Sequence, residues 1–475
     1  MAILPWEKFL LAFGLGWLGV IFHRVFLAPL SRIPGPWYAP FLNTLLVYKE
    51  LVGQRRVYVH NLHKKYGPVV RLGPNEVSFT SLEALKEIYQ SDGSGYNKTE
   101  FYNLFRQYGL RTTFSSLSKA DHTQMKRYIA GPYANSNIMH PEVLSGIEER
   151  ATAFIKQCIR FGSAAVDVYI LLHCFALDCA SLHLFKPHGT KSLEGTDIAI
   201  MRELSFDNSR RKKISEYRFP TLSNWRQAAC RPATVSLANE FVLVASVKKD
   251  VSSHTLAHKL QNSNGAFQNI QIAAECMNHM FAGIDTTGDA LCFLMYHLSL
   301  PKNFDVQERL IAELTASPSH DIDELQYLEA VVKEGLRCFP PIPMSQLRRV
   351  PLNGRRIDGY FIPAGVTVSC QAWSVHQLNE DVFPQGNQFV PERWLDPKAI
   401  THMNKCFFSF GLGGRGCTGR NLALAEEKCL LRQVYSRYRT KVASEMRGSS
   451  MALSDQAIST RPVDQTCKLV FEPLG

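Results

Sequence analysis

The stretch that most restricts the fold is a glycine-rich loop near the C-terminus, Phe408–Gly419, which reads FSFGLGGRGCTG. Its glycines permit backbone conformations and close approaches that a side chain would forbid. A single thiol, Cys417, stands two residues after Arg415 and just before a helix expected over Asn421–Tyr438. A helix N-terminus favours an anion, and such surroundings or a metal lower the pKa of a thiol from its usual ~8.5. The loop is therefore suited to hold a thiolate, although a turn around an ordinary buried cysteine has the same composition.

The composition fits one large domain rather than several. Of the 475 residues, 45% are hydrophobic and 20% are charged, which is enough for a large buried core. Length alone would suggest about three domains. However, no linker rich in proline, glycine and serine divides the chain after residue 40, and no repeat is present. The 12 cysteines are scattered without a CxxC pair, which is typical of reduced, buried thiols in a cytosol-facing protein.

The chain is basic, with a formal net charge of +11. A basic excess is typical of proteins that meet nucleic acid, an anionic membrane surface or an acidic protein partner. No block of lysine and arginine and no nucleic-acid motif occurs. We therefore expect no nucleic-acid partner and retain the other two classes.

The N-terminus is apolar, since Phe9–Phe22 reads FLLAFGLGWLGVIF without a charge. With Leu4 and Val25–Leu27 added, the segment approaches the ~20 residues that cross a bilayer. His23 and Arg24 interrupt it. A cleaved signal peptide and a buried helix are the alternatives, but no convincing small-x-small cleavage site follows. Positive charge is greater after the segment than before it, which by the positive-inside rule places the main body in the cytosol.

A proline-rich stretch follows, and Ile33–Pro40 reads IPGPWYAP. Proline fixes φ and removes an amide donor, so we expect a stiff, non-helical spacer. An ordinary surface loop has the same composition. The sequence thus predicts an uncleaved membrane anchor over residues 1–30, a hinge over 31–41 and one large domain over 42–475.

The coarse pattern is mainly helical. Residues 141–300 show long helical periodicity with few strand signals, and they end in an apolar helix expected over Gln271–Leu298. A polar run, Asp285–Asp289, interrupts that helix. Another helix is expected over 321–338, where Pro340-Pro341 must end it.

Minor sheet is expected in two places. Two short strands, Val69–Gly73 and Glu76–Thr80, follow a helix that ends near Tyr66. Residues 350–371 alternate like small strands, with turns at Asn353-Gly354 and Asp358-Gly359. The fold class is therefore mainly α with minor β.

The complete spacing Phe410-x-x-Gly413-x-Arg415-x-Cys417-x-Gly419 resembles the haem-binding loop of the cytochrome P450 family. The resemblance implies that Cys417 is the axial thiolate ligand of haem b (iron protoporphyrin IX) and that Phe410 packs near the haem. It also implies that Arg415 pairs with a haem propionate, because guanidinium can bind a carboxylate through two parallel hydrogen bonds. A thiolate ligand favours cleavage of the O–O bond.

Two upstream segments match a further motif of the family. Glu334 and Arg337 stand at i and i+3 on one expected helix. Pairs at this spacing are common on surfaces and contribute little by themselves. Val390–Trp394 reads VPERW and supplies Arg393. By resemblance, the three charged residues form a buried structural network on the cysteine side of the core, and such a network tolerates the loss of one partner badly.

Ala282–Thr287 reads AGIDTT and lies in the middle of the long apolar helix. Polar side chains there are costly unless they have partners or a function, and a kink with locally satisfied hydroxyls is the alternative. The resemblance implies that Gly283 leaves room for dioxygen, that Thr286 stabilises it, and that Asp285 helps relay protons. Thr287 is the adjacent hydroxyl and the weaker candidate.

The segment His122–Arg127 resembles a helix of the family that contacts a haem propionate through an aromatic residue or histidine and a basic residue four positions later. His122 and Lys126 share a helix face. Because lysine replaces the usual arginine, both Lys126 and Arg127 are candidates, and so is a solvated basic face without this function. Arg348 stands where the family often has another propionate ligand.

The resemblance covers essentially the whole chain and implies the cytochrome P450 fold, a helical haem-thiolate domain with small sheets, preceded by an N-terminal transmembrane helix. It points to a membrane-anchored, eukaryotic microsomal type. Small departures exist, such as Leu347 where proline often precedes the arginine.

The leading hypothesis is a haem-thiolate monooxygenase that inserts one oxygen atom of O2 into a lipophilic small molecule. No flavin or nicotinamide domain fits in the chain, so electrons from NADPH would come through an NADPH–cytochrome P450 reductase on the same endoplasmic reticulum membrane. Cytochrome b5 is a second candidate partner. A basic docking face would include Lys119, Lys126, Arg127, Lys405 and Arg420.

Two other functions stay open from the sequence. One is a haem-thiolate isomerase or dehydratase that needs no reductase, against which the Asp285-Thr286 pair argues. The other is a non-enzymatic haem sensor. The expected substrate-pocket segments, about Tyr96–Phe114, Met277–Phe281 and Pro341–Ser345, are apolar and aromatic and favour a lipophilic substrate. Similarity to fungal secondary-metabolism members suggests a terpenoid, polyketide or alkaloid intermediate.

Overall fold

Helices form most of the molecule, as the apolar periodicity predicts. The computed structural model describes residues 5–22, 28–90, 95–160, 162, 164–206, 210–219, 221 and 236–475. The α-helices within these ranges are α1 (Pro5–Phe22), α2 (Thr44–Leu51), α3 (Arg55–Tyr66), α4 (Leu82–Leu85), α5 (Lys119–Ile129), α6 (Asn135–Ile138), α7 (Pro141–Cys158), α8 (Val168–Phe185), α9 (Ile198–Phe206), α10 (Arg210–Arg218), α12 (Leu237–Ala245), α13 (Leu256–Gln261), α14 (Asn269–Leu298), α15 (Phe304–Ala316), α16 (Gln326–Cys338), α17 (Ala372–Leu378), α18 (Ile400–Cys406) and α19 (Arg420–Tyr435).

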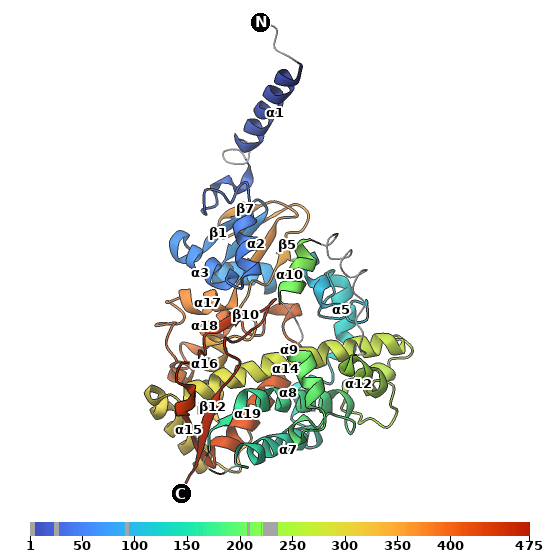
Figure 1. The fold of residues 1–475 in the computed structure, drawn as a ribbon, viewed down its shortest axis with the longest axis vertical. Helices are drawn as coiled ribbons and strands as arrows, with labels where there is room; N and C mark the ends of the chain where they lie inside the picture. The colour runs from blue at the N-terminus through green and yellow to red at the C-terminus, as the bar shows by residue number, and fades with distance from the viewer. Residues whose placement is uncertain are drawn as a thin grey trace.

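The long helix α14 crosses the helical part of the molecule and packs along α8 (Figure 1). Glycines permit this close contact, since a Cβ at Gly288 would lie 3.0 Å from the His173 ring. Of the described helices, α8 is the one whose length and hydropathy would suit a membrane span, but 89% of its residues are buried inside the protein. A helix that is apolar all round belongs in a core, and α8 is such a helix.

The largest sheet has the order β1-β2-β8-β5-β3 and lies toward the end of the domain from which α1 extends (Figure 1). Its outer pair, β3 and β5, sets Lys98 directly opposite Arg348. This register matters for the site, because it brings together two cations that lie 250 positions apart in the sequence. The described strands are β1 (Val69–Gly73), β2 (Glu76–Phe79), β3 (Asn97–Lys98), β4 (Val166–Asp167), β5 (Arg348–Arg349), β6 (Arg355–Ile357), β7 (Tyr360–Ile362), β8 (Thr367–Cys370), β9 (Tyr438–Val442), β10 (Leu453–Asp455), β11 (Thr460–Pro462) and β12 (Lys468–Pro473).

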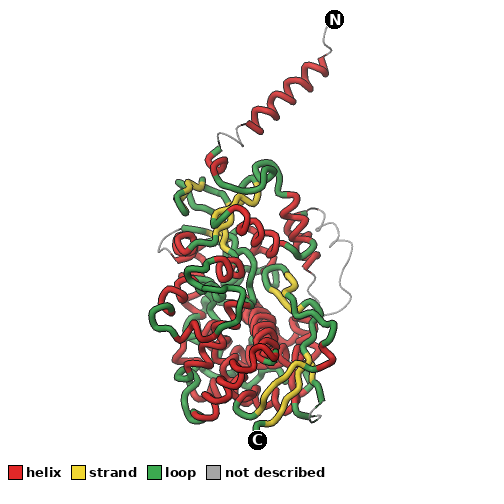
Figure 2. The backbone as a smooth tube through the Cα atoms, turned by 90° about the vertical axis from the view of Figure 1, so that its left-hand side faces the viewer, coloured by secondary structure: helices red, strands yellow, loops and turns green. Residues whose placement is uncertain are grey.

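The prediction of a mainly helical fold with small sheets is confirmed, and Figure 2 shows the strands as short segments around the helices. The Asp358-Gly359 turn also forms as predicted, joining β6 to β7 with φ of 49° and 80°. Two positive φ values match the type I′ turn of tight hairpins.

Two helix boundaries differ from the prediction, and so does the course of α14. α16 begins only at Gln326, where the Glu313 carboxylate accepts the free amides of Tyr327 and Leu328 (2.7 and 2.8 Å). α19 ends at Tyr435, because Tyr438 pairs with Pro473 in a sheet. The polar run at 285–289 does not break α14, because its side chains find partners that are described below.

The N-terminal helix α1 extends away from the domain, as both views show, and exposes Phe9, Leu11 and Phe13 (Figures 1 and 2). Leu4, His23, Arg24 and residues 25–27 lie outside the described residues. The segment after α1 is non-helical around Pro34, whose carbonyl accepts the Arg71 amide (2.8 Å). The division into anchor, hinge and domain at residues 30 and 41 stays a prediction.

Candidate functional site

One large cavity brings together the cysteine loop, α14, α5 and the sheet. The space between its walls, including its opening to solvent, is about 1470 Å³. Nine of the residues predicted for the site line it: His122, Gly283, Thr286, Thr287, Arg348, Phe410, Arg415, Cys417 and Gly419.

Cys417 differs from the other cysteines in its surroundings. Of the 11 cysteines that the structure describes, ten are buried and Cys417 is exposed. That exposure faces the cavity. Burial inside the protein nevertheless raises the pKa of the free thiol, and the Gly419 amide, Lys126 and Arg420 oppose this shift only in part. The surroundings of the free thiol therefore favour its protonated form, and a cation bound to the sulfur would favour the thiolate instead.

The glycines of the loop allow it to pack directly on the neighbouring backbone. Gly413 has φ of 63°, and a Cβ there would lie 2.0 Å from the Tyr89 carbonyl oxygen. Lys126 Nζ donates to the Gly414 carbonyl (2.8 Å), which ties α5 to the loop. Arg127 is exposed and does not line the cavity. Of the two basic residues that the sequence left as alternatives, Lys126 is thus the one in contact with the loop.

Cations gather at one end of the cavity. Arg415 donates to the Ser116 and Leu117 carbonyls (2.8 and 2.7 Å), but its buried Nε has no hydrogen-bond partner. Arg348 Nη1 donates to the Tyr102 hydroxyl (3.2 Å). Lys98 lies beside them, buried over the Tyr102 ring. Within the described residues, none of these three cations forms a salt bridge with a carboxylate.

Burial and neighbouring positive charges depress the pKa values of Lys98, Arg415 and His122. The pKa of Arg415 falls to about 10, first because of burial and then because of Arg348. The pKa of His122 falls to about 3, again chiefly because of burial, with Arg415, Lys98 and Lys126 adding to the shift. A buried cluster of like charges is unfavourable by itself, so this end of the cavity is suited to a ligand that carries more than one negative charge.

Sequence reasoning missed Lys98 and Glu426. Lys98 belongs to no motif and becomes visible only through the pairing of β3 with β5. Glu426 lies on α19 and lines the cavity, with one carboxylate oxygen lacking a partner. Its other oxygen accepts the Thr287 hydroxyl (3.1 Å), and burial raises its pKa to about 8.

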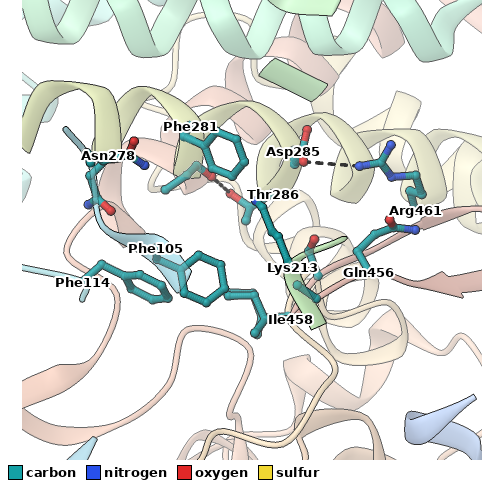
Figure 3. A pocket seen from close by; sticks show the side chains of 15 residues that line it. Phe105, Phe114, Lys213, Asn278, Phe281, Asp285, Thr286, Gln456, Ile458 and Arg461 are labelled. Atoms are coloured by element: carbon teal, nitrogen blue, oxygen red, sulfur yellow. Dashed lines mark hydrogen bonds and ion pairs between the residues drawn. The ribbon is translucent and has the colours of Figure 1, made fainter. Parts of the chain in front are cut away.

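The polar residues of α14 divide between two cavities. Thr286 faces both and donates its hydroxyl to the Ala282 carbonyl one turn earlier (2.6 Å). Asp285 lines only the second cavity, where its carboxylate lies 3.6 Å from Arg461 (Figure 3). A Cβ at Gly283 would lie 2.9 Å from the Ala180 Cβ, so glycine is needed there for helix packing as well.

The second cavity adjoins the first beyond Thr286 and encloses about 770 Å³ including its opening. All three segments predicted for the substrate pocket contribute to it, through Phe105 and Phe114, through Phe281, and through Ile342. Figure 3 shows Phe105, Phe114 and Ile458 facing the same space below α14. Residues 456–461 complete the wall. Sequence reasoning did not identify this last segment, because a turn between two short strands carries no motif.

The predicted network of Glu334, Arg337 and Arg393 lies behind the cysteine loop rather than in a cavity. Glu334 accepts hydrogen bonds from Arg337 (2.8 Å), Arg393 (3.1 Å) and the Trp394 indole (2.9 Å). Arg337 and Glu334 are completely buried. The Arg337 carbonyl in turn contacts His376 Nδ1 (3.0 Å), whose Nε2 accepts the Phe408 amide (2.8 Å) at the start of the loop. The network therefore positions the loop without touching the cavity.

Glu275 provides a pH-dependent contact near the site. Its carboxylate accepts the Thr113 amide (2.7 Å), which holds a wall of the cavity against α14, and burial raises its pKa to about 7. The unfolded-state pKa is lower, so the stabilising effect of the protonated form is complete below about 4.3 and is lost as the pH rises through the folded-state pKa. This loss should amount to roughly 3 kcal/mol between these two pKa values.

We therefore expect the stability of the wild-type protein to fall more steeply between pH 5 and pH 8 than that of Glu275→Gln, which cannot ionise. Thermal unfolding midpoints of both proteins, measured across this range, provide the test. Parallel pH profiles would show that the pKa of Glu275 is not raised in the folded protein. The exposed Glu308→Gln is the control and should follow the wild type.

A model of the cytochrome P450 family matches residues 33–467 of this chain, which include the cysteine loop, α14 and the Glu334 network. The chain belongs to the cytochrome P450 family. It is similar to three fungal enzymes of that family. Cytochrome P450 monooxygenase orf2 of Aspergillus niger is 28% identical and covers 86% of either chain. Monooxygenase atnE of Emericella nidulans is 27% identical, covering 88% of this chain and 89% of its own. Monooxygenase ORF11 of Penicillium roqueforti is also 27% identical, and the match covers 90% of this chain and 93% of that protein.

Membership of this family makes the chain an enzyme of the cytochrome P450 monooxygenase type. Enzymes of this family use a haem with a cysteine thiolate ligand, dioxygen and electrons from a redox partner. The residues of this P450 fit such a group in two respects. The cavity-facing thiol offers one axial ligand, and the unpaired cations at one end match two propionates in charge.

Proposed function

We propose that this P450 is a haem-thiolate monooxygenase that hydroxylates a lipophilic small molecule of fungal secondary metabolism. The observation that carries the proposal is the juxtaposition of one cavity-facing thiol, Cys417, with a cluster of unpaired buried cations and an adjoining aromatic pocket. Cys417 would bind the iron of haem b, and Arg415, Arg348, His122 and Lys98 would surround the propionates. Phe410 lines the cavity and would pack on the porphyrin.

When bound, the haem supplies the oxidising chemistry. The protein then has to orient the substrate, exclude water and deliver protons. The aromatic side chains around Phe114 exclude water from the pocket next to Thr286. The Thr286 hydroxyl donates its own proton to Ala282, so its lone pairs are free to accept a hydrogen bond from the cavity side. A proton that reaches Thr286 through Asp285 must first pass the ion pair with Arg461.

NADPH–cytochrome P450 reductase is the proposed electron donor, with cytochrome b5 as an additional partner. The exposed cations Arg127, Lys405 and Arg420 would contribute to a docking face for an acidic partner. We also propose that α1 anchors the enzyme in the endoplasmic reticulum membrane with the domain in the cytosol. The exposed apolar side chains of α1 and its extension away from the domain support this proposal (Figure 1).

The proposal is tested by replacing Thr286 with alanine in the haem-loaded enzyme. Without the hydroxyl, we expect the ratio of product formed to NADPH consumed to fall by at least about tenfold, because proton delivery by a positioned group contributes roughly 100- to 10,000-fold. The ratio is measured with reductase and a panel of terpenoid and polyketide substrates, by following product formation together with the consumption of NADPH and oxygen. Thr286→Ser keeps the hydroxyl and should retain most of it.

A Thr286→Ala enzyme with the wild-type ratio would contradict the role of the hydroxyl. Substrate turnover without reductase and oxygen would instead indicate an isomerase or dehydratase. Haem binding without any turnover would indicate a sensor.

A further inference from the structure

The adjoining pocket is mainly apolar, and its charged residues comprise two cations and one carboxylate. Its walls are formed mainly by Phe105, Phe114, Phe281, Ile342 and Ile458. Three charged residues reach it, Lys213, Asp285 and Arg461. Since Asp285 and Arg461 face one another at 3.6 Å, their charges largely cancel. Lys213 remains, and Figure 3 shows its side chain between Thr286 and Ile458.

Lys213 lies on α10 and is half-buried. Its Nζ lies 4.9 Å from the centre of the Phe281 ring and 5.8 Å from that of Phe105. Within the described residues it makes no hydrogen bond and no salt bridge. Burial lowers the pKa of this ammonium group, and the nearby charges of Asp285 and Glu216 oppose the shift. Since neither carboxylate lies at salt-bridge distance, the cation over the aromatic faces is stabilised only in part.

The rest of the pocket is consistent with a polar group of the ligand at this position. The side-chain amides of Gln107 and Gln456 belong to the same lining, and each can donate hydrogen bonds. An ammonium group has three donors and no acceptor, so its preferred partner is an oxygen anion. A protonated amine in the same place would be repelled.

We propose that the substrate carries a carboxylate that pairs with Lys213 Nζ, while its apolar body lies along the phenylalanine wall toward Thr286. This inference rests on the proposed monooxygenase function, since it assigns the second cavity to the substrate. It narrows the substrate class to lipophilic acids and excludes basic alkaloids.

The test compares acids with their methyl esters on the haem-loaded full-length protein. The probes are dodecanoic acid, abietic acid and 1-naphthaleneacetic acid, each with its methyl ester, together with dodecylamine. Equilibrium dialysis measures affinity independently of turnover, and the Soret shift reports approach to the haem. We expect at least one acid to bind wild type more tightly than its ester, and Lys213→Met to weaken the binding of that acid about 10- to 100-fold while leaving the ester unchanged.

Three further variants sharpen the comparison. Lys213→Arg keeps the charge and should retain the preference for acid, whereas Lys213→Glu should bind dodecylamine more tightly than dodecanoic acid. Lys212→Met removes a neighbouring exposed lysine outside the pocket and should behave as wild type. The inference is wrong if no acid binds wild type better than its ester, or if Lys213→Met retains the preference. The carbon monoxide spectrum is recorded separately, so a protein without the thiolate band refutes the proposed function rather than the role of Lys213.

Discussion

Replacement of Cys417 by serine is expected to abolish the long-wavelength Soret band of the reduced, carbon monoxide-treated protein and to reduce monooxygenase activity to background. The reason is that this band and the activation of oxygen depend on a sulfur anion bound to the iron. Serine places a far weaker anionic donor at the same position. Because burial already disfavours an anion at residue 417, an alkoxide is even less accessible there.

Cys158→Ala is the matched control for this experiment. Cys158 is a buried thiol at the end of α7, away from both cavities, so its removal should preserve the band. Haem content is measured by an alkaline pyridine assay, which does not require the thiolate. If Cys417→Ser retains the band at normal haem content, the sulfur ligand has been assigned to the wrong residue.

Replacement of Glu334 by alanine is expected to destabilise the protein by about 3–5 kcal/mol, because it leaves Arg337 buried beside empty space without its counter-ion. Arg393 and the Trp394 indole also lose an acceptor. The loss should appear as a large decrease in the thermal midpoint and in the yield of haem-loaded protein. Glu334→Gln keeps acceptor oxygen but not charge and should lie between alanine and wild type.

The exposed pair of Glu308 and Arg439 provides the comparison. Glu308→Ala should change stability by no more than about 1 kcal/mol, because solvent screens surface ion pairs. A Glu334→Ala protein as stable as Glu308→Ala would show that the network does not support the fold. Normal stability combined with a shifted Soret band would instead assign it to positioning of the loop alone.

The parts of the fold that the sequence predicted well are those set by local chemistry. The Asp358-Gly359 turn needs two residues that tolerate positive φ, and these two residues supply them. The apolar run of α14 likewise fixes a buried helix. Helix ends were harder to predict, because they depend on distant partners such as the Glu313 carboxylate in front of α16.

The same distinction applies to the site. The motif around Cys417 identified the loop that forms one wall of the large cavity. Lys98, Lys213 and Arg461 stand in no recognisable spacing, and only strand pairing and helix packing bring them to the cavities. Asp285 was identified from its motif, but the ion pair with Arg461 that accompanies it could not be foreseen.

The hydrogen bonds from Arg337 through His376 to Phe408 anchor the cysteine loop from behind, whereas residues 456–459, the turn between β10 and β11, form part of the wall of the second cavity. The loop and the turn have separate mechanical supports. Mutations in the turn can therefore accumulate during divergence and reshape which molecules enter, while the ligand geometry of the iron stays the same. An enzyme constructed in this way can acquire new substrates while the residues that support its oxidising group stay unchanged.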